Sequence, residues 1–143
     1  MNKKAEAFQE YLQAKNITCF QVQEVAEDPL NTVVFRSVIA VEGQELPTLV
    51  VLDDSIYSIV RVRIIGNALK EENETALVKA INGLNAQYKV FKYYFAQDGA
   101  LMLDCCLPSR VDVLDGDMVY TILDVIIQHL QGEFKNIMKL VWA

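Results

Sequence analysis

The chain has 143 residues, 52% of them apolar, and a formal net charge of −6. A chain of this length forms one domain and can bury a core that needs no disulfide or metal for stability. An acidic chain whose Lys and Arg residues are scattered is a poor partner for nucleic acid, and no segment approaches the roughly eighteen apolar residues of a membrane span.

The N-terminus and the cysteines predict a cytoplasmic protein. The opening segment MNKKAEAFQEYLQAKN lacks the run of about seven apolar residues that a secretory signal needs. The three cysteines are odd in number and have no framework spacing, which is typical of free thiols in a reducing compartment. We therefore expect a single cytoplasmic domain over residues 1–143.

The first half of the chain predicts one helix and four strands. Phe8, Tyr11 and Leu12 belong to a narrow apolar stripe that predicts a helix over Lys3–Lys15. Asn16 suits the left-handed position that follows a helix. Apolar runs and alternations then predict strands in the segments 18–28, 32–44, 46–54 and 56–66.

Particular residues mark the turns and faces of these strands. Gly43 is expected at positive φ in the turn between the second and third strands. Pro47 lies near the start of the third strand, where a missing N–H is tolerated. Arg61 and Arg63 are two residues apart in the fourth strand, so they share a face, which we expect to be the solvated one.

The second half predicts a helix, a hairpin and a long final helix. Asn73 is a fair N-cap for the first of these helices, and Asp98-Gly99 between alternating runs is among the strongest hairpin signals. Asp115 or Asp117 caps the last helix. Gly132 within it indicates a tight helix contact or a kink rather than a functional hinge. The apolar stripes expected to be buried are Ala76, Leu77, Ala80, Ile81 and Leu84, and then Val119, Ile122, Leu123, Ile126, Leu130, Phe134, Ile137 and Met138.

These elements predict an α+β fold. Their order is α-β-β-β-β-α-β-β-α, with no repeat, linker or low-complexity segment between them. Strands joined by short turns favour an antiparallel sheet, and we expect the helices to pack on one of its faces.

Two adjacent cysteines, Cys105 and Cys106, are the most conspicuous candidates for chemistry. Neighbouring side chains of a strand point to opposite faces, so this pair is badly placed to bind one metal ion. Cys105 continues an apolar row of leucines and is predicted to be core, as is Cys19. Cys106 shares its face with Asp104, which leaves a reactive Cys106 as an alternative, although no basic neighbour favours its thiolate.

The other candidates have structural explanations. His129, the single histidine, is expected to be solvated or at a helix edge rather than catalytic. The chain has no glycine-rich phosphate loop, nucleophile elbow or HExxH motif, so we assign no catalytic, cofactor-binding or metal-binding residue. Turn chemistry and the helix dipole account for the acidic pairs Asp53–Asp54, Glu71–Glu72 and Asp115–Asp117.

Aromatic residues gather in the segment 88–95. A stacking platform for single-stranded nucleic acid also needs positive charge, but only Lys89 and Lys92 are near these rings and the molecule is acidic. Core packing together with a peptide-facing surface is the better interpretation.

The segment LNAQYKVFKYYFAQDGALMLDCCLP, followed by an acidic turn and a long helix, resembles the YbjN-like family of bacterial proteins. The resemblance extends over Ala76–Met138, and the chain departs from the family at Cys105-Cys106 and in lacking a Tyr-Pro ending after the last helix. It implies a fold like that of type III secretion chaperones, with a strongly curved antiparallel sheet and frequent dimerisation, and a regulatory role without an assigned reaction. The matching residues are Leu84-Asn85, Tyr88, Lys92-Tyr93-Tyr94, Asp98-Gly99, Leu101-Met102-Leu103 and Leu107-Pro108.

Three functional hypotheses follow. The first is a non-enzymatic protein, monomeric or homodimeric, that holds a protein segment in an apolar groove or along a strand edge. The second is a thiol-dependent enzyme or redox sensor that uses Cys106, with or without His129. The third is a domain that binds a small ligand between the sheet and the helices. The large apolar share, the lack of catalytic spacing and the family resemblance favour the first.

Overall fold

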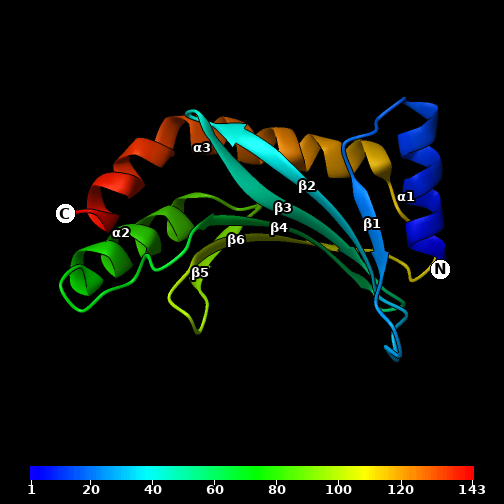
Figure 1. Ribbon diagram of the computed structural model, residues 1–143, viewed down its shortest axis with the longest axis horizontal. Coiled ribbons are helices and arrows are strands. Elements are labelled where there is room, and N and C mark those ends of the chain that lie inside the picture. The colour runs from blue at the N-terminus through cyan, green and yellow to red at the C-terminus, as the bar shows by residue number, and fades with distance from the viewer.

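The computed structural model describes residues 1–143 and confirms the predicted α+β fold and element order (Figure 1). Six strands form one open antiparallel sheet in the spatial order β1-β2-β3-β4-β6-β5. Figure 1 shows a strongly curved sheet, with α3 running along it and α1 and α2 at opposite ends. The elements are α1 (Lys3–Ala14), β1 (Gln21–Glu24), β2 (Val33–Val41), β3 (Gln44–Leu52), β4 (Tyr57–Ile65), α2 (Glu74–Gln87), β5 (Lys92–Phe95), β6 (Leu101–Pro108) and α3 (Gly116–Val141).

Strand alternation divides the sheet into an inner face, covered by the helices, and an outer face that no helix covers. Alternate residues of each long strand are buried, as the period of two requires. The inner face joins all three helices in one hydrophobic cluster. Its strand members are Val33, Phe35, Ile39, Val41, Leu46, Val50, Leu52, Val60, Val62, Ile64, Tyr93, Leu101, Leu103 and Cys105.

The last helix supplies most of the helical side of this core. Its predicted apolar stripe is confirmed, with only Met138 less than fully buried. At about 1.5 Å per residue, the 26 residues of α3 span roughly 39 Å, so one helix crosses the whole sheet. Each fully buried Leu or Phe side chain contributes about 1.5–3 kcal/mol, and α3 is therefore the main source of stability for the inner face.

Aromatic packing holds α1 on the core. The ring of Phe8 lies edge-on to Phe35, with centroids 4.9 Å apart, and to Phe20 at 5.6 Å. The ring of Tyr11 lies against the first residue of α3, so that a Cβ on Gly116 would be 2.3 Å from Tyr11 Cγ. Only glycine fits this contact between the two helices.

The β2–β3 hairpin determines which way the backbone of β3 faces. Its two-residue turn, Glu42-Gly43, has positive φ at both positions, as a type I′ turn requires, and Val41–Gln44 is the closing hydrogen-bonded pair. Hydrogen-bonded and non-hydrogen-bonded pairs alternate along an antiparallel ladder. Pro47, opposite Val38, therefore lies in a non-hydrogen-bonded pair, and its nitrogen faces β4.

This proline splits the sheet at one end. Because Pro47 has no N–H, it cannot donate to a ladder with β4. The β3–β4 ladder begins one residue later, at Thr48 and Val62, although both strands continue beyond that point. The last residues of β4 pair only with β6, with a bulge between Arg63 and Ile65. The expectation that Pro47 occupies a position without a needed N–H is confirmed.

Several local expectations were wrong. The first strand is only Gln21–Glu24 and all of it is exposed, because it is an edge strand paired with β2 alone. Ala76 is exposed and only Leu77 and Ile81 of α2 are fully buried. A Cβ on Gly132 would meet nothing within 4 Å, so this glycine makes no tight helix contact. Figure 1 shows the C-terminal end of α3 turning toward α2.

Asn73 occupies the expected N-cap position of α2, but its side chain makes other bonds. Its Nδ2 donates to the carbonyl oxygens of Ala68 (2.8 Å) and Val141 (3.1 Å), and its Oδ1 accepts from the N–H of Lys70 (2.8 Å). This buried amide ties the last turn of α3 to the loop before α2. No helix of the protein is both long enough and apolar enough to cross a membrane.

We expect Gly116→Ala to destabilise the protein by about 1–3 kcal/mol, because its methyl group overlaps the ring of Tyr11. Gly132→Ala is the matched control in the same helix and should stabilise by up to about 1 kcal/mol, since its methyl group enters open space. Urea unfolding monitored by circular dichroism measures both. Equal effects of the two substitutions would contradict the described packing of α1 on α3.

Candidate functional site

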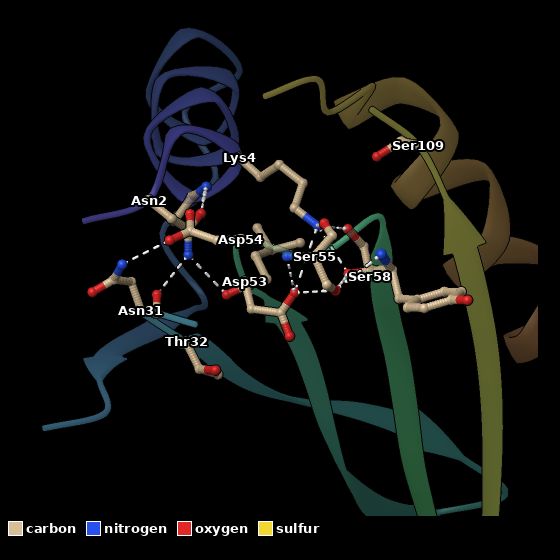
Figure 2. Close-up of polar contacts among 12 residues, drawn as sticks. Asn2, Lys4, Asn31, Thr32, Asp53, Asp54, Ser55, Ser58 and Ser109 are labelled. Atoms are coloured by element: carbon tan, nitrogen blue, oxygen red, sulfur yellow. Dashed lines mark hydrogen bonds and ion pairs between the residues drawn. The ribbon is translucent and has the colours of Figure 1, made fainter. Parts of the chain in front are cut away.

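A buried polar cluster lies where α1 meets the β3–β4 turn (Figure 2). The side chain of Lys4 is fully buried, and its Nζ donates to the carbonyl oxygens of Ser55 (2.9 Å) and Tyr57 (2.8 Å) and to Ser58 Oγ (3.0 Å). Asp53 Oδ1 is 4.0 Å from the same nitrogen. Burial lowers the pKa of Lys4, whereas the carboxylate of Asp53 acts in the opposite direction.

This cluster is a structural clamp rather than a reactive site. All three donors of the ammonium group are used, and Lys4 and Ser58 are both buried. The cavity beside Ser58 has a volume of about 90 Å³, which is the space of roughly three water molecules. Asn2 extends the clamp, since its Nδ2 donates to the carbonyl oxygens of Asn31 (2.8 Å) and Leu52 (2.9 Å). The first residues of α1 are thereby fixed to the ends of β3 and β4.

The cysteines lie apart from this cluster and from one another. Cys105 is buried in the core as predicted, and burial raises its pKa to about 11. Cys106 is exposed on the outer face, opposite Ile59 of β4. The prediction that Cys19 is core was wrong: it precedes β1 and is exposed.

His129 is buried and not solvated, which corrects the sequence-based expectation. Its side chain is 8% exposed, and its Nε2 lies 2.6 Å from the hydroxyl of Tyr93. The rings of Tyr88 and Phe91 pack on the imidazole, with centroids 4.4 and 4.5 Å away. Nδ1 is buried without a partner. The aromatic rings around His129 therefore favour its neutral form, and burial lowers the pKa of His129.

The version of the thiol hypothesis that pairs Cys106 with His129 needs the two side chains to meet, and the fold keeps them apart. His129 bonds Tyr93 on the inner side of the sheet, whereas Cys106 points to the outer side. No group of three or more His, Cys, Asp or Glu side chains is close enough to hold a metal ion. The acidic pairs serve turns and helix starts, with Asp53 accepting from the N–H of Ser55 and Asp115 capping α3.

The outer face is the remaining candidate site, because no helix covers it. The ion pair of Arg61 and Asp104 lies at the middle of this face. Arg61 Nε and Nη2 donate hydrogen bonds to Asp104 Oδ1 (2.9 Å) and Oδ2 (2.8 Å). This bond raises the pKa of Arg61. Tyr94 donates to the same carboxylate at 3.3 Å. A partly exposed pair contributes at most about 1 kcal/mol to stability, so its main effect is to hold the Arg61 guanidinium in place.

Apolar side chains surround this ion pair. The cross-strand row of Arg36, Leu49, Arg61, Asp104 and Lys92 has mostly apolar rows on either side, and one of these neighbouring rows also contains Arg63. We define the outer face by its residues Val34, Arg36, Val38, Ala40, Glu45, Pro47, Leu49, Val51, Tyr57, Ile59, Arg61, Arg63, Ile65, Lys92, Tyr94, Met102, Asp104, Cys106 and Pro108.

Part of this surface could be predicted from local spacing. The shared face of Arg61 and Arg63 follows from their spacing and is confirmed. The neighbourhood of Arg61 and Asp104 depends on β4 pairing with β6 across α2 and β5, which no local pattern specifies. The surplus of apolar residues on both faces of β2 was the available signal that the second face is also used.

No protein-family model matches the sequence, and no curated protein matches it. The resemblance of residues Ala76–Met138 to YbjN-like proteins therefore stays a prediction from the motif.

The buried histidine predicts a loss of stability on acidification. The pKa of His129 is lowered in the folded state, so below about pH 6.5 the unfolded chain binds more protons than the folded one. The free energy of unfolding therefore decreases as the pH is lowered. His129→Gln keeps a neutral hydrogen-bonding group and should flatten this dependence. Urea unfolding between pH 7.5 and 5.5, where most carboxylates stay ionised, measures both proteins. Identical slopes would show that His129 is not the group that titrates.

The cysteine positions predict two classes of thiol. Cys19 and Cys106 should react with a disulfide reagent such as DTNB in the native protein, whereas Cys105 should react only after unfolding, because it is buried and its pKa is raised to about 11. Cys106→Ser should remove one of the fast thiols. Three fast thiols in the native protein would contradict the placement of Cys105 in the core.

Proposed function

We propose that the protein is a non-enzymatic binding domain that holds a protein segment with acidic and apolar side chains against the outer face. The observation that carries this proposal is the mixture on a face that no helix covers. Val38, Tyr57 and Tyr94 are 51%, 53% and 37% exposed there, and arginines lie between them. These three side chains lie in different parts of the face, and the half-buried Leu49, Val51 and Ile59 lie on the strands between them. Exposed apolar surface that is rimmed by polar residues marks interaction sites.

The size of the outer face suits a protein partner. Six strands about 4.8 Å apart are roughly 24 Å wide. The four long strands reach roughly 25–30 Å, whereas β1 and β5 have four residues each and reach about 13 Å, so the area is about 600 Å². A standard protein–protein interface buries about 800 Å² on each partner. A segment that covers the whole face would therefore bury about 600 Å² on each partner, which is the lower limit for a specific interface.

Charge selects the partner. The outer face carries four cations, Arg36, Arg61, Arg63 and Lys92, against the carboxylates of Glu45 and Asp104, although the whole chain has a net charge of −6. A positive face on an acidic molecule attracts acidic segments and steers their approach. Two copies that stack these faces on one another would instead bring like charges together. Arginine is also enriched at the residues that dominate binding energy.

The resemblance to secretion chaperones supports the same class of function, because it implies a protein that holds a partner rather than one that transforms a substrate. The homodimer hypothesis remains the competing use of the outer face. The thiol hypothesis loses the version that uses His129, because this side chain bonds Tyr93 on the inner side of the sheet. A redox sensor that uses the exposed Cys106 alone stays the alternative.

Labelled synthetic peptides test the proposal by fluorescence anisotropy. A peptide that alternates Glu with Leu or Val should bind, and its affinity should fall as salt is raised. A matched peptide with Lys in place of Glu should bind at least about tenfold more weakly, a difference of about 1.4 kcal/mol. Val38→Glu and Arg36→Glu should each reduce the affinity for the acidic peptide by a similar factor, since both side chains are exposed on the outer face.

Val78→Glu is the control, because Val78 is an exposed valine on α2, away from the outer face. An equal loss with this variant, or equal binding of the Lys peptide, would overturn the proposal. Light scattering supplies the competing outcome: a dimer that Val38→Glu dissociates would make the outer face a homodimer interface instead.

A further inference from the structure

The split between β3 and β4 opens into a cavity of about 460 Å³. Six apolar side chains line it, contributed by the two strands and by the C-terminal end of α3: Leu46, Ile64, Ile65, Phe134, Met138 and Trp142. We call this cavity the split pocket. Small-molecule sites typically have volumes of about 300–1,000 Å³, mostly apolar walls and a few polar groups, and the split pocket has these properties.

The backbone around the split pocket argues against a peptide strand as its occupant. An added strand needs N–H and C=O groups along the edge that it joins. On the β3 side that edge contains Pro47, whose nitrogen faces the gap without a hydrogen. The same proline that separates the strands therefore makes the gap a poor acceptor of a further strand, and a compact ligand fits the geometry better.

The mouth of the split pocket carries positive charge. The guanidinium of Arg63 folds back over Gly66, where an added Cβ would lie 2.8 Å from Nη2, so the glycine leaves room for it. Arg63 has a single long ion pair, with Asp98 at 3.9 Å, and is half-exposed. Its donors are therefore largely free.

The α3 side of the groove adds further cations. A second cavity of about 480 Å³ adjoins the split pocket and shares Phe134, Met138 and Trp142 with it. Lys139 lines that cavity and has no carboxylate within ion-pair distance, whereas Lys135 is paired with Glu42 at 3.4 Å. Glu45 is the one unpaired carboxylate of the split pocket itself.

We propose that the split pocket binds a small amphipathic carboxylate. Its apolar chain lies on Phe134 and Met138, and its carboxylate accepts hydrogen bonds from the guanidinium of Arg63, a geometry in which arginine binds carboxylates with two parallel bonds. The ligand site is separate from the acidic segment proposed for the outer face, although Arg63 lies at the border of both.

The protein contains its own reporter for this site. Trp142 is the only tryptophan of the chain, it lines the split pocket, and it is 65% exposed. Lys70 Nζ lies 4.4 Å from the centre of its ring. When the apolar chain of the ligand fills the pocket, it removes water from the indole of Trp142, so the tryptophan emission should shift to shorter wavelength.

Titration of the whole protein with decanoate, below its micelle concentration, tests the proposal. Decanol has the same chain without the charge, and decylamine has the opposite charge. We expect a saturable blue shift of Trp142 with decanoate, and at least about tenfold weaker binding of decanol and decylamine, because a charge-assisted pair is lost. Arg63→Gln should reduce the affinity for decanoate to that for decanol and leave the affinity for decanol unchanged.

Arg36→Gln is the matched control, since Arg36 is an exposed arginine of the same sheet that does not line the pocket. Circular dichroism checks that both variants fold. Equal binding of decanoate and decanol, an equal effect of Arg36→Gln, or no change in Trp142 emission would each overturn the proposal. Failure here leaves the peptide experiment on the outer face untouched, because that experiment uses Arg36 and Val38.

Discussion

Three helices cover only one face of a six-stranded sheet, and this imbalance determines the rest of the structure. The helices and the inner face form one cluster of 29 buried residues, which is the hydrophobic core of the domain. The outer face then keeps apolar side chains that the fold itself does not use. An isolated surface leucine needs no explanation, but a whole uncovered sheet face that mixes apolar side chains with arginines does. The proposed function assigns that surface to a partner.

The sequence predicted the elements and the core because both are local patterns. Alternation placed Cys105 inward and Cys106 outward, and the helical period selected the buried stripe of α3. The same reasoning failed for His129 and Cys19, for opposite reasons. His129 lies beside the apolar stripe of α3, and aromatic rings near β5 pack on its imidazole and bury it. Cys19 precedes an edge strand, which has a neighbouring strand on one side only. Burial at such positions depends on distant elements, which periodicity does not contain.

Lys4 shows the same limit in a polar setting. On the sequence it is one of two adjacent lysines at the start of an amphipathic helix, and such residues are almost never fully buried unless paired. Its partners are backbone carbonyls of the β3–β4 turn, more than fifty residues away. Removing such a group leaves buried acceptors unpaired, which is costlier than losing an exposed ion pair. The Pro47 split is comparable: the proline was visible in the sequence, but the strand that it fails to bond was not.

The pairing of β4 with β6 also has a consequence for how the chain folds. β2, β3 and β4 are consecutive and join through short turns, so their ladders close small loops. Val62 pairs with Leu103 only after α2 and β5 have been placed between them, and closing a longer loop costs more chain entropy. Helix α3 then seals both parts, because it contacts β2 and β4 alike. The split between β3 and β4 thus lies within the part of the sheet that local connections assemble, and the β4–β6 ladder is the seam that joins this part to the rest through contacts of large sequence separation.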